Sequence, residues 1–408
     1  MLLEKKIICS LCSTFIIGFG SVLIQSILTN ASDYYTLYSI NTILLINSGL
    51  SLIISPFSII FIDKYIFFRD SYNKNIYFNL YIDAFKKLLI IASIFIINII
   101  IFYNLIEYIF SINNNEFIFV NILFVFFSLI LLFNRSILLF QDRYFLTLCI
   151  DFFCILLKIF IIFLLIYNNN STQLLIYGVI FIEFLSALLF YLCLKFDYDQ
   201  VHKISITIKD IFYKYIIILL KYINIFLLIQ FDLIIVKKNY NEFDFINYSI
   251  ISSVGKIPVF ISMAIAFVAY PIISRNIKQN VSSNRIILYL IFLIMILNLT
   301  LSLLIFYFSK ELILLLYGNK YLYLLTTFKI YSFCFIPVSI IIFLEQAKIT
   351  SNSFLMGITS LSLMLSLYLF YKNFTISYDM VPYIILFHSS LSIVIIITYS
   401  LFKLRKIS

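Results

Sequence analysis

Long, uninterrupted apolar stretches follow one another along the whole chain and restrict its fold more than any other feature. Each has about the 20 residues that an α-helix needs to cross roughly 30 Å of hydrocarbon. Their polarity does not alternate, as it would in the shorter strands of a transmembrane barrel. With 63% hydrophobic and 12% charged residues, against roughly 25% charged residues in soluble domains, the sequence predicts an all-α polytopic membrane protein.

Twelve transmembrane helices are expected from these stretches. The first six cover residues 7–28, 36–62, 88–110, 117–133, 145–167 and 173–194. The second six cover residues 211–236, 245–273, 286–308, 323–344, 353–370 and 380–401.

Lys and Arg are distributed unevenly between the connecting segments. Most of the 29 basic residues lie on the side that holds Lys5 and Lys6, and few lie in the loops of the other side. Because cytoplasmic loops carry an excess of Lys and Arg, both termini are expected in the cytoplasm. The net charge of +10 is then a topology signal, and it does not indicate a nucleic-acid partner.

The sequence also repeats. Residues 33–40 and residues 243–250 end in the shared tripeptide Tyr-Ser-Ile, at Tyr38 and at Tyr248. Both copies enter an even-numbered predicted span, which is typical of two parallel repeats about an axis along the membrane normal. We therefore predict an N-terminal six-helix bundle over residues 1–210 and a C-terminal one over residues 211–408.

Three segments point to a known family. They are Ser26–Leu45, with the loop that begins Asp33-Tyr34-Tyr35; the stretch from Phe231-Asp232 to Pro271-Ile272-Ile273-Ser274-Arg275; and Lys310–Tyr321, with Gly318. Together they resemble the Wzx-type O-antigen and capsule flippases of the MATE-like (MOP) exporter superfamily.

This resemblance implies two six-helix bundles around a central cavity that opens alternately to each side. It implies transport of an oligosaccharide on undecaprenyl pyrophosphate, for O-antigen or capsule in lipopolysaccharide and polysaccharide biosynthesis. The expected partners are the lipid-linked oligosaccharide, membrane lipids and polysaccharide assembly proteins. No cofactor, metal or catalytic residue is expected.

Ionisable residues at membrane depth are costly and are therefore functional candidates. Lys158 and Glu183 fall near the midplane on consecutive predicted helices. A structural ion pair between them is favoured over a role in transport.

Lys221 and Lys256 also fall near the midplane, but two like charges cannot neutralise each other. Asp232 follows Lys221 by three helical turns, which is too far along the axis for direct pairing. We expect both lysines to face water or an anion, and the substrate pyrophosphate would supply one. Snorkelling, or a partner such as Glu345, is the alternative.

Small polar residues recur on one face of two predicted spans. Asn47 and Ser51 lie in the second span, and Ser252 and Ser253 lie in the eighth, next to Lys256. Their spacing predicts a polar stripe that lines the cavity, although such stripes also mediate plain helix packing. The predicted substrate-binding set is Lys221, Lys256, Asp232, Asn47, Ser51, Ser252 and Ser253.

Charged residues also gather at the predicted cytoplasmic mouth. They are Asp63, Lys64, Arg135 and Lys348. These residues either only fix the topology or also catch the pyrophosphate headgroup.

Two other functions compete with the flippase. A cation-coupled multidrug exporter would share the architecture, but it favours an acidic cavity. A membrane O-antigen polymerase or glycosyltransferase would need a sizeable outer loop with catalytic groups, and no predicted outer loop is that long. An enzyme is therefore the weaker hypothesis.

Overall fold

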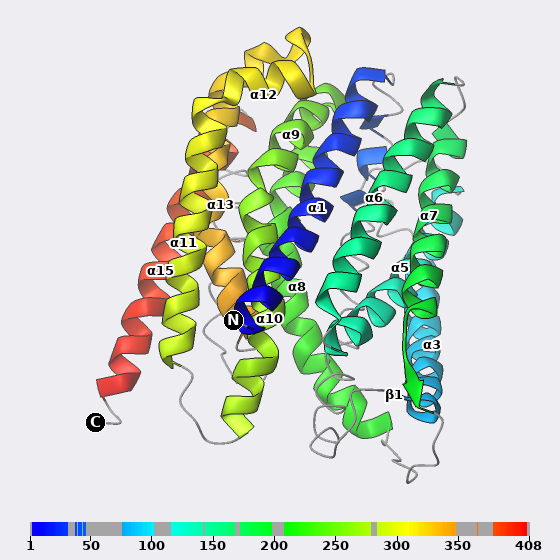
Figure 1. The fold of residues 1–408 in the computed structure, drawn as a ribbon. Helices are drawn as coiled ribbons and strands as arrows, with labels where there is room; N and C mark the ends of the chain where they lie inside the picture. The colour runs from blue at the N-terminus through cyan, green and yellow to red at the C-terminus, as the bar shows by residue number, and fades with distance from the viewer. Residues whose placement is uncertain are drawn as a thin grey trace. The chain divides into compact units, whose positions relative to one another are not determined.

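The computed structural model describes residues 2–31, 37–38, 40–42, 44–45, 76–101, 116–141, 143–167, 172–197, 208–278, 284–347, 365 and 378–405. Almost all of these residues are helical (Figure 1). The chain divides into two compact units: unit 1 comprises residues 1–38 and 224–408, and unit 2 comprises residues 39–223. The predicted division at residue 210 stays a prediction, and the contact-based units differ from it by grouping residues 1–38 with the C-terminal part.

Unit 2 is built from α3 (Phe78–Ile101), α5 (Glu116–Phe140), α6 (Tyr144–Tyr167) and α7 (Thr172–Leu192), together with the first part of α8 (Ile208–Asn239). Helix α7 packs against both α5 and α6. Two short strands, β1 (Ile76–Tyr77) and β2 (Phe196–Asp197), pair in parallel, with Ile76 opposite Phe196.

Unit 1 contains α1 (Leu2–Ala31), the rest of α8, α9 (Glu242–Gly255), α10 (Ile257–Lys278), α11 (Asn284–Tyr307) and α12 (Ser309–Leu316). It continues with the 3₁₀ turn η1 (Asn319–Leu324), α13 (Leu325–Ala347), η2 (Tyr378–Met380) and α15 (Val381–Arg405). Helix α13 is central to this unit, because it packs against α9, α10, α11 and α15. Helix α1 packs mainly against α10.

The eighth predicted span is broken at Lys256 into α9 and α10, which are bent by 42°. Pro258 explains the break, because it has no N–H to donate to the carbonyl of Val254 one turn earlier. The backbone N–H of Lys256 instead closes the end of α9 on the carbonyl of Ser252, at 3.2 Å. Lys256 therefore stands at the bend between α9 and α10.

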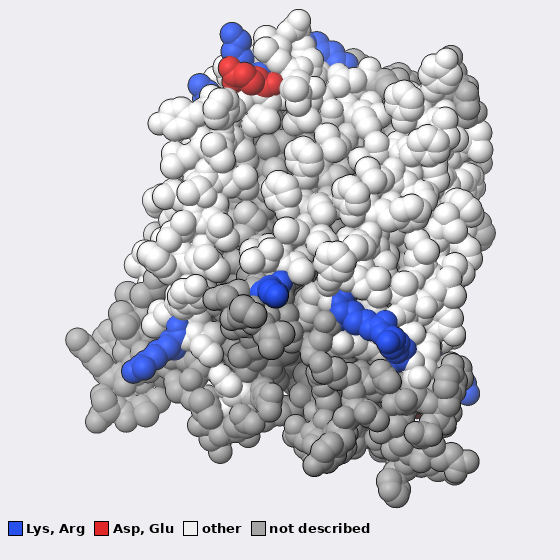
Figure 2. All heavy atoms as spheres, viewed as in Figure 1, with Lys and Arg blue, Asp and Glu red and all other residues white. Residues whose placement is uncertain are grey.

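The exposed surfaces of the helices are apolar, as contact with lipid requires. Helices α6 and α11 expose large apolar side chains along their length, including Phe152 and Phe160 on α6 and Phe292 and Leu299 on α11. Figure 2 shows charged side chains toward the two ends of one face, with uncharged side chains between them. By length and composition, five described helices can cross a membrane, or six when α9 and α10 count as one span.

The predicted spans 36–62 and 353–370 lie largely outside the described residues, and the other ten each overlap described helices. Three details were wrong. The third span, predicted over residues 88–110, already begins at Phe78 in α3, and the fourth, predicted over residues 117–133, is the longer helix α5. The short helix α12, which follows the ninth span, was not predicted.

Candidate functional site

The most heavily buried charged cluster described in unit 1 surrounds the carboxylate of Asp232, on α8. Lys256 Nζ lies 3.0 Å from Asp232 Oδ1, and Tyr248 donates a hydrogen bond to Asp232 Oδ2 at 3.1 Å. Tyr331, on α13, donates a second hydrogen bond to Oδ2. These four residues, which we call the Asp232 hub, join α8, α9 and α13 inside the unit.

The hub is buried, so its charged groups depend on hydrogen bonds to other protein groups. Asp232 is 3% exposed and Lys256 is 5% exposed, while both tyrosines are fully buried. Lys256 also donates to Gln230 Oε1 at 3.2 Å, so its ammonium has a second oxygen partner. A buried charge pair is tolerated only when further hydrogen bonds satisfy its remaining lone pairs and protons, and the hub meets that condition.

The local sequence explains how the hub forms. Tyr248 and Ser252 are four residues apart and share one face of α9, and the Ser252 hydroxyl lies 3.2 Å from Tyr331 Oη. Gly255 follows on the same helix and leaves room for the Tyr331 ring. The helix break then turns Lys256 toward Asp232.

The expectation that Lys256 is an unpaired cation was therefore wrong. Its partner is Asp232, and neither an anionic ligand nor Glu345 is needed to explain its burial. Lys221 is half-buried on the part of α8 that belongs to unit 2. The expectation that Lys221 faces water or an anion stays a prediction.

The polar stripe is only partly described. Ser252 belongs to the edge of the hub, and Ser253 Oγ lies 3.0 Å from the hydroxyl of Tyr317. Both serines therefore make contacts inside unit 1, as in helix packing. Asn47 and Ser51 lie outside the described residues.

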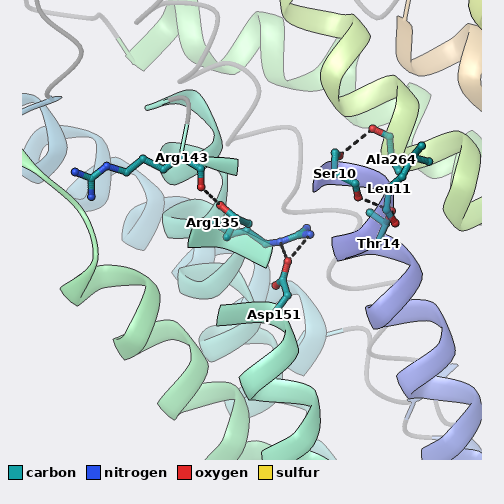
Figure 3. A network of polar contacts seen from close by, with 8 residues as sticks. Ser10, Leu11, Thr14, Arg135, Arg143, Asp151 and Ala264 are labelled. Carbon is teal, nitrogen blue, oxygen red and sulfur yellow. Dashed lines mark hydrogen bonds and ion pairs between the residues drawn. The ribbon is translucent and has the colours of Figure 1, made fainter. Parts of the chain in front are cut away.

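The predicted mouth residue Arg135, on α5, is engaged within unit 2. Its Nη2 atom lies 3.0 Å from Asp151 Oδ2 on α6, and its Nε atom lies 3.3 Å from the same oxygen. Figure 3 shows this pair pointing toward each other from the two helices. Arg135 is thus not a simple solvated topology determinant, whereas Asp63, Lys64 and Lys348 lie outside the described residues.

The expected pair of Lys158 and Glu183 is present in unit 2, where the Lys158 ammonium contacts Glu183 Oε1. It joins α6 to α7, and Glu183 is the more deeply buried partner. Its dependence on both charges stays a prediction.

The tyrosines of the hub were missed from sequence. Tyr248 stands in the repeated Tyr-Ser-Ile tripeptide, which is the signal that could have singled it out. Tyr331 gives no such signal, because it lies 99 residues from Asp232 on another helix. Among the described residues, no group of three or more His, Cys, Asp or Glu side chains could hold a metal ion.

No protein-family model and no curated protein sequence matches this chain. Solved structures do match. An inward-facing multidrug-resistance MATE transporter of the MOP superfamily superposes with a TM-score of 0.69 at 12% identity, over 98% of both chains. An outward-facing MATE transporter of the same superfamily gives 0.63 at 12% identity, over 99% of this chain and 96% of that one.

The fold is that of the MOP superfamily transporters. The described residues are almost entirely helical, and five of their helices, or six with α9 and α10 as one span, can cross a membrane, as expected for the predicted all-α membrane protein. Another match is a MOP superfamily transporter from Pyrococcus furiosus, described as having a binding pocket of reverse polarity that suggests a different function. It gives a TM-score of 0.63 at 14% identity, over 97% of this chain and 93% of that one.

Proposed function

We propose that this chain is a bacterial inner-membrane flippase that moves an oligosaccharide on undecaprenyl pyrophosphate to the outer leaflet by alternating access. Both termini are cytoplasmic in this proposal. The MOP fold supports a transporter, and the segments that resemble Wzx-type flippases support this substrate class. The proposal includes membrane lipids and polysaccharide assembly proteins as partners.

The observation that carries the choice of substrate is the state of the buried acids. Of the four buried acids that the structure describes, Asp151, Glu183 and Asp232 each lie in an ion pair with a basic side chain of a neighbouring element, and the fourth is Glu345 on α13. A carboxylate already matched by Lys or Arg offers little attraction to an organic cation, because the local field is close to neutral. These acids do not form the acidic cavity that suits a cation exporter.

Since Lys256 is committed to Asp232, Lys221 is the remaining mid-helix candidate for the pyrophosphate. It is half-buried on α8, where a lysine ammonium can act as a point-charge binder of phosphate. Asn47 and Ser51 stay in the proposed set of residues that line the transport route.

The test is complementation in a bacterium that lacks its own O-antigen flippase and has a matching repeat unit. The wild-type chain should restore surface polysaccharide. Lys221→Ala should abolish most of this export at normal membrane abundance, while Lys221→Arg should retain more because it keeps the charge. Lys238→Ala, at the exposed end of the same helix, is the matched control and should export normally.

A multidrug exporter is the second candidate, and the likeness to MATE structures favours it. It predicts that the chain lowers the accumulation of a cationic dye, such as ethidium, in a drug-sensitive strain. Ethidium efflux together with failure to restore polysaccharide would replace the flippase by this second function.

A further inference from the structure

Aromatic and acidic side chains gather at one end of unit 1, where α8 ends at Asn239, α9 begins at Glu242 and α13 begins at Leu325. The turn η2 joins them there, because Tyr378 packs edge-on against Tyr240 with ring centroids 6.1 Å apart. The group, which we call the aromatic–carboxylate cluster, consists of Tyr240, Phe243, Asp244, Tyr323, Tyr378 and Asp379. The predicted topology places it on the outer side of the membrane.

Two rings of the cluster form an exposed apolar surface. Phe243 and Tyr323 are nearly parallel, at 9° with centroids 6.5 Å apart, and they are 46% and 55% exposed. The Tyr323 hydroxyl donates to Asn247 Oδ1 at 2.7 Å, which holds its ring in place. Asn247 is fully buried. The cluster therefore has a ring that a buried amide holds in place from behind.

The carboxylates of Asp244 and Asp379 lie near Tyr240 and Tyr378 of the same cluster. Burial, followed by the charges of Asp244 and Asp379, raises the pKa of the Tyr240 hydroxyl to about 12. Asp379 is oriented by Thr327, whose hydroxyl donates to Asp379 Oδ1 at 2.6 Å. Lys237 does not offset these acids at the surface, because it is buried with Nζ 4.0 Å from the centroid of the Tyr38 ring.

The two carboxylates repel an anion such as phosphate, and the adjacent exposed cation is Lys238, at the end of α8. The aromatic–carboxylate cluster suits a sugar ring. The C–H faces of a sugar can stack on aromatic rings that are apolar on their faces, and sugar hydroxyls can donate to carboxylates that only accept hydrogen bonds.

We propose that Phe243 and Tyr323, with Asp244 and Asp379, form a carbohydrate-binding subsite for uncharged sugar residues of the glycan. The inference rests on the proposed function and adds a place where the glycan is held apart from its pyrophosphate. The subsite binds the glycan at the outer end of unit 1, while the lipid-linked phosphate is bound elsewhere.

Direct binding tests the subsite. The probe is an oligosaccharide released by mild acid from the surface polysaccharide of the host, added to the full chain in nanodiscs and followed by saturation-transfer NMR. Phe243→Ala with Tyr323→Ala should weaken binding at least tenfold, equivalent to about 1.4 kcal/mol. Phe292→Ala, which removes an even more exposed ring from α11, should bind like wild type.

Two results would overturn the subsite. One is equal binding by the double variant and wild type. The other is that the organic cation tetraphenylphosphonium binds in place of the sugar or competes with it. Aromatic rings beside carboxylates also attract organic cations.

The complementation assay in cells distinguishes failure of the subsite from failure of the flippase. If wild-type chain restores surface polysaccharide and the double variant exports less at equal abundance, both are supported. If wild type and the double variant export equally, the subsite is wrong while the flippase stands. If wild type does not export, the flippase is wrong, and the binding result alone then decides the sugar site.

Discussion

Tyr331 packs so closely on Gly255 that a β-carbon at residue 255 would lie 1.8 Å from its Cδ1 atom. The contact joins α13 to the last residue of α9, next to the bend at Lys256. The same tyrosine donates a hydrogen bond to Asp232. The absent side chain of Gly255 is thus what lets α13 reach the Asp232 hub.

Gly255→Ala should therefore destabilise unit 1. The added methyl group must displace an aromatic ring that is held by hydrogen bonds, and overpacking of this kind typically costs about 1–3 kcal/mol. The midpoint of thermal unfolding in detergent, followed by size-exclusion fluorescence, should fall, and so should membrane abundance.

Gly178→Ala is the matched control for this change. Its β-carbon would meet the end of the flexible Leu165 side chain at 2.7 Å, so a rotation of that side chain can relieve the clash. An equal loss of stability in the two variants would show that the ring contact at Gly255 has no special weight.

Lys256→Ala should be more damaging than loss of both charges together. It leaves the Asp232 carboxylate buried without its cation, and breaking a buried pair on one side typically costs about 3–5 kcal/mol. The double variant Lys256→Ala with Asp232→Ala should recover part of the loss in unfolding midpoint. If the double variant is as unstable as the sum of the two single variants, the pair is not coupled.

Lys158 and Glu183 should depend on each other in the same way, with a smaller effect. The Lys158 side chain is 23% exposed, so its charge is less completely buried when Glu183 is removed. Each single neutral substitution should lower membrane abundance, and the swap Lys158→Glu with Glu183→Lys should restore part of it. Normal abundance and transport in Glu183→Gln would rule out a structural role for the pair.

Reporter fusions at Asn169 and at Ser408 check the topology. The uneven distribution of Lys and Arg predicts an outer location for residue 169 and a cytoplasmic one for residue 408. Alkaline phosphatase should be active at the first site and inactive at the second. Activity at Ser408 would contradict an even number of spans.

Several features of this protein follow from its sequence alone. Apolar stretches of membrane length must become helices, because lipid offers no partner to backbone N–H and C=O groups. Counting residues along two consecutive spans placed Lys158 and Glu183 at one depth, and the structure joins them. Such counting works for neighbouring helices that run straight and antiparallel.

The Asp232 hub was decided by tertiary structure. By residue count, Asp232 lies nearer than Lys256 to the connection between α8 and α9, by roughly 10 Å along the axis. Side chains tilt toward the N-terminus of their own helix, so those of antiparallel α8 and α9 converge, and the long lysine side chain closes the gap. Tyr331 then enters from α13, through a space that exists only because Gly255 has no side chain. A one-dimensional pattern contains neither the tilt of side chains between helices nor the packing of a third helix, and these determine which charges meet.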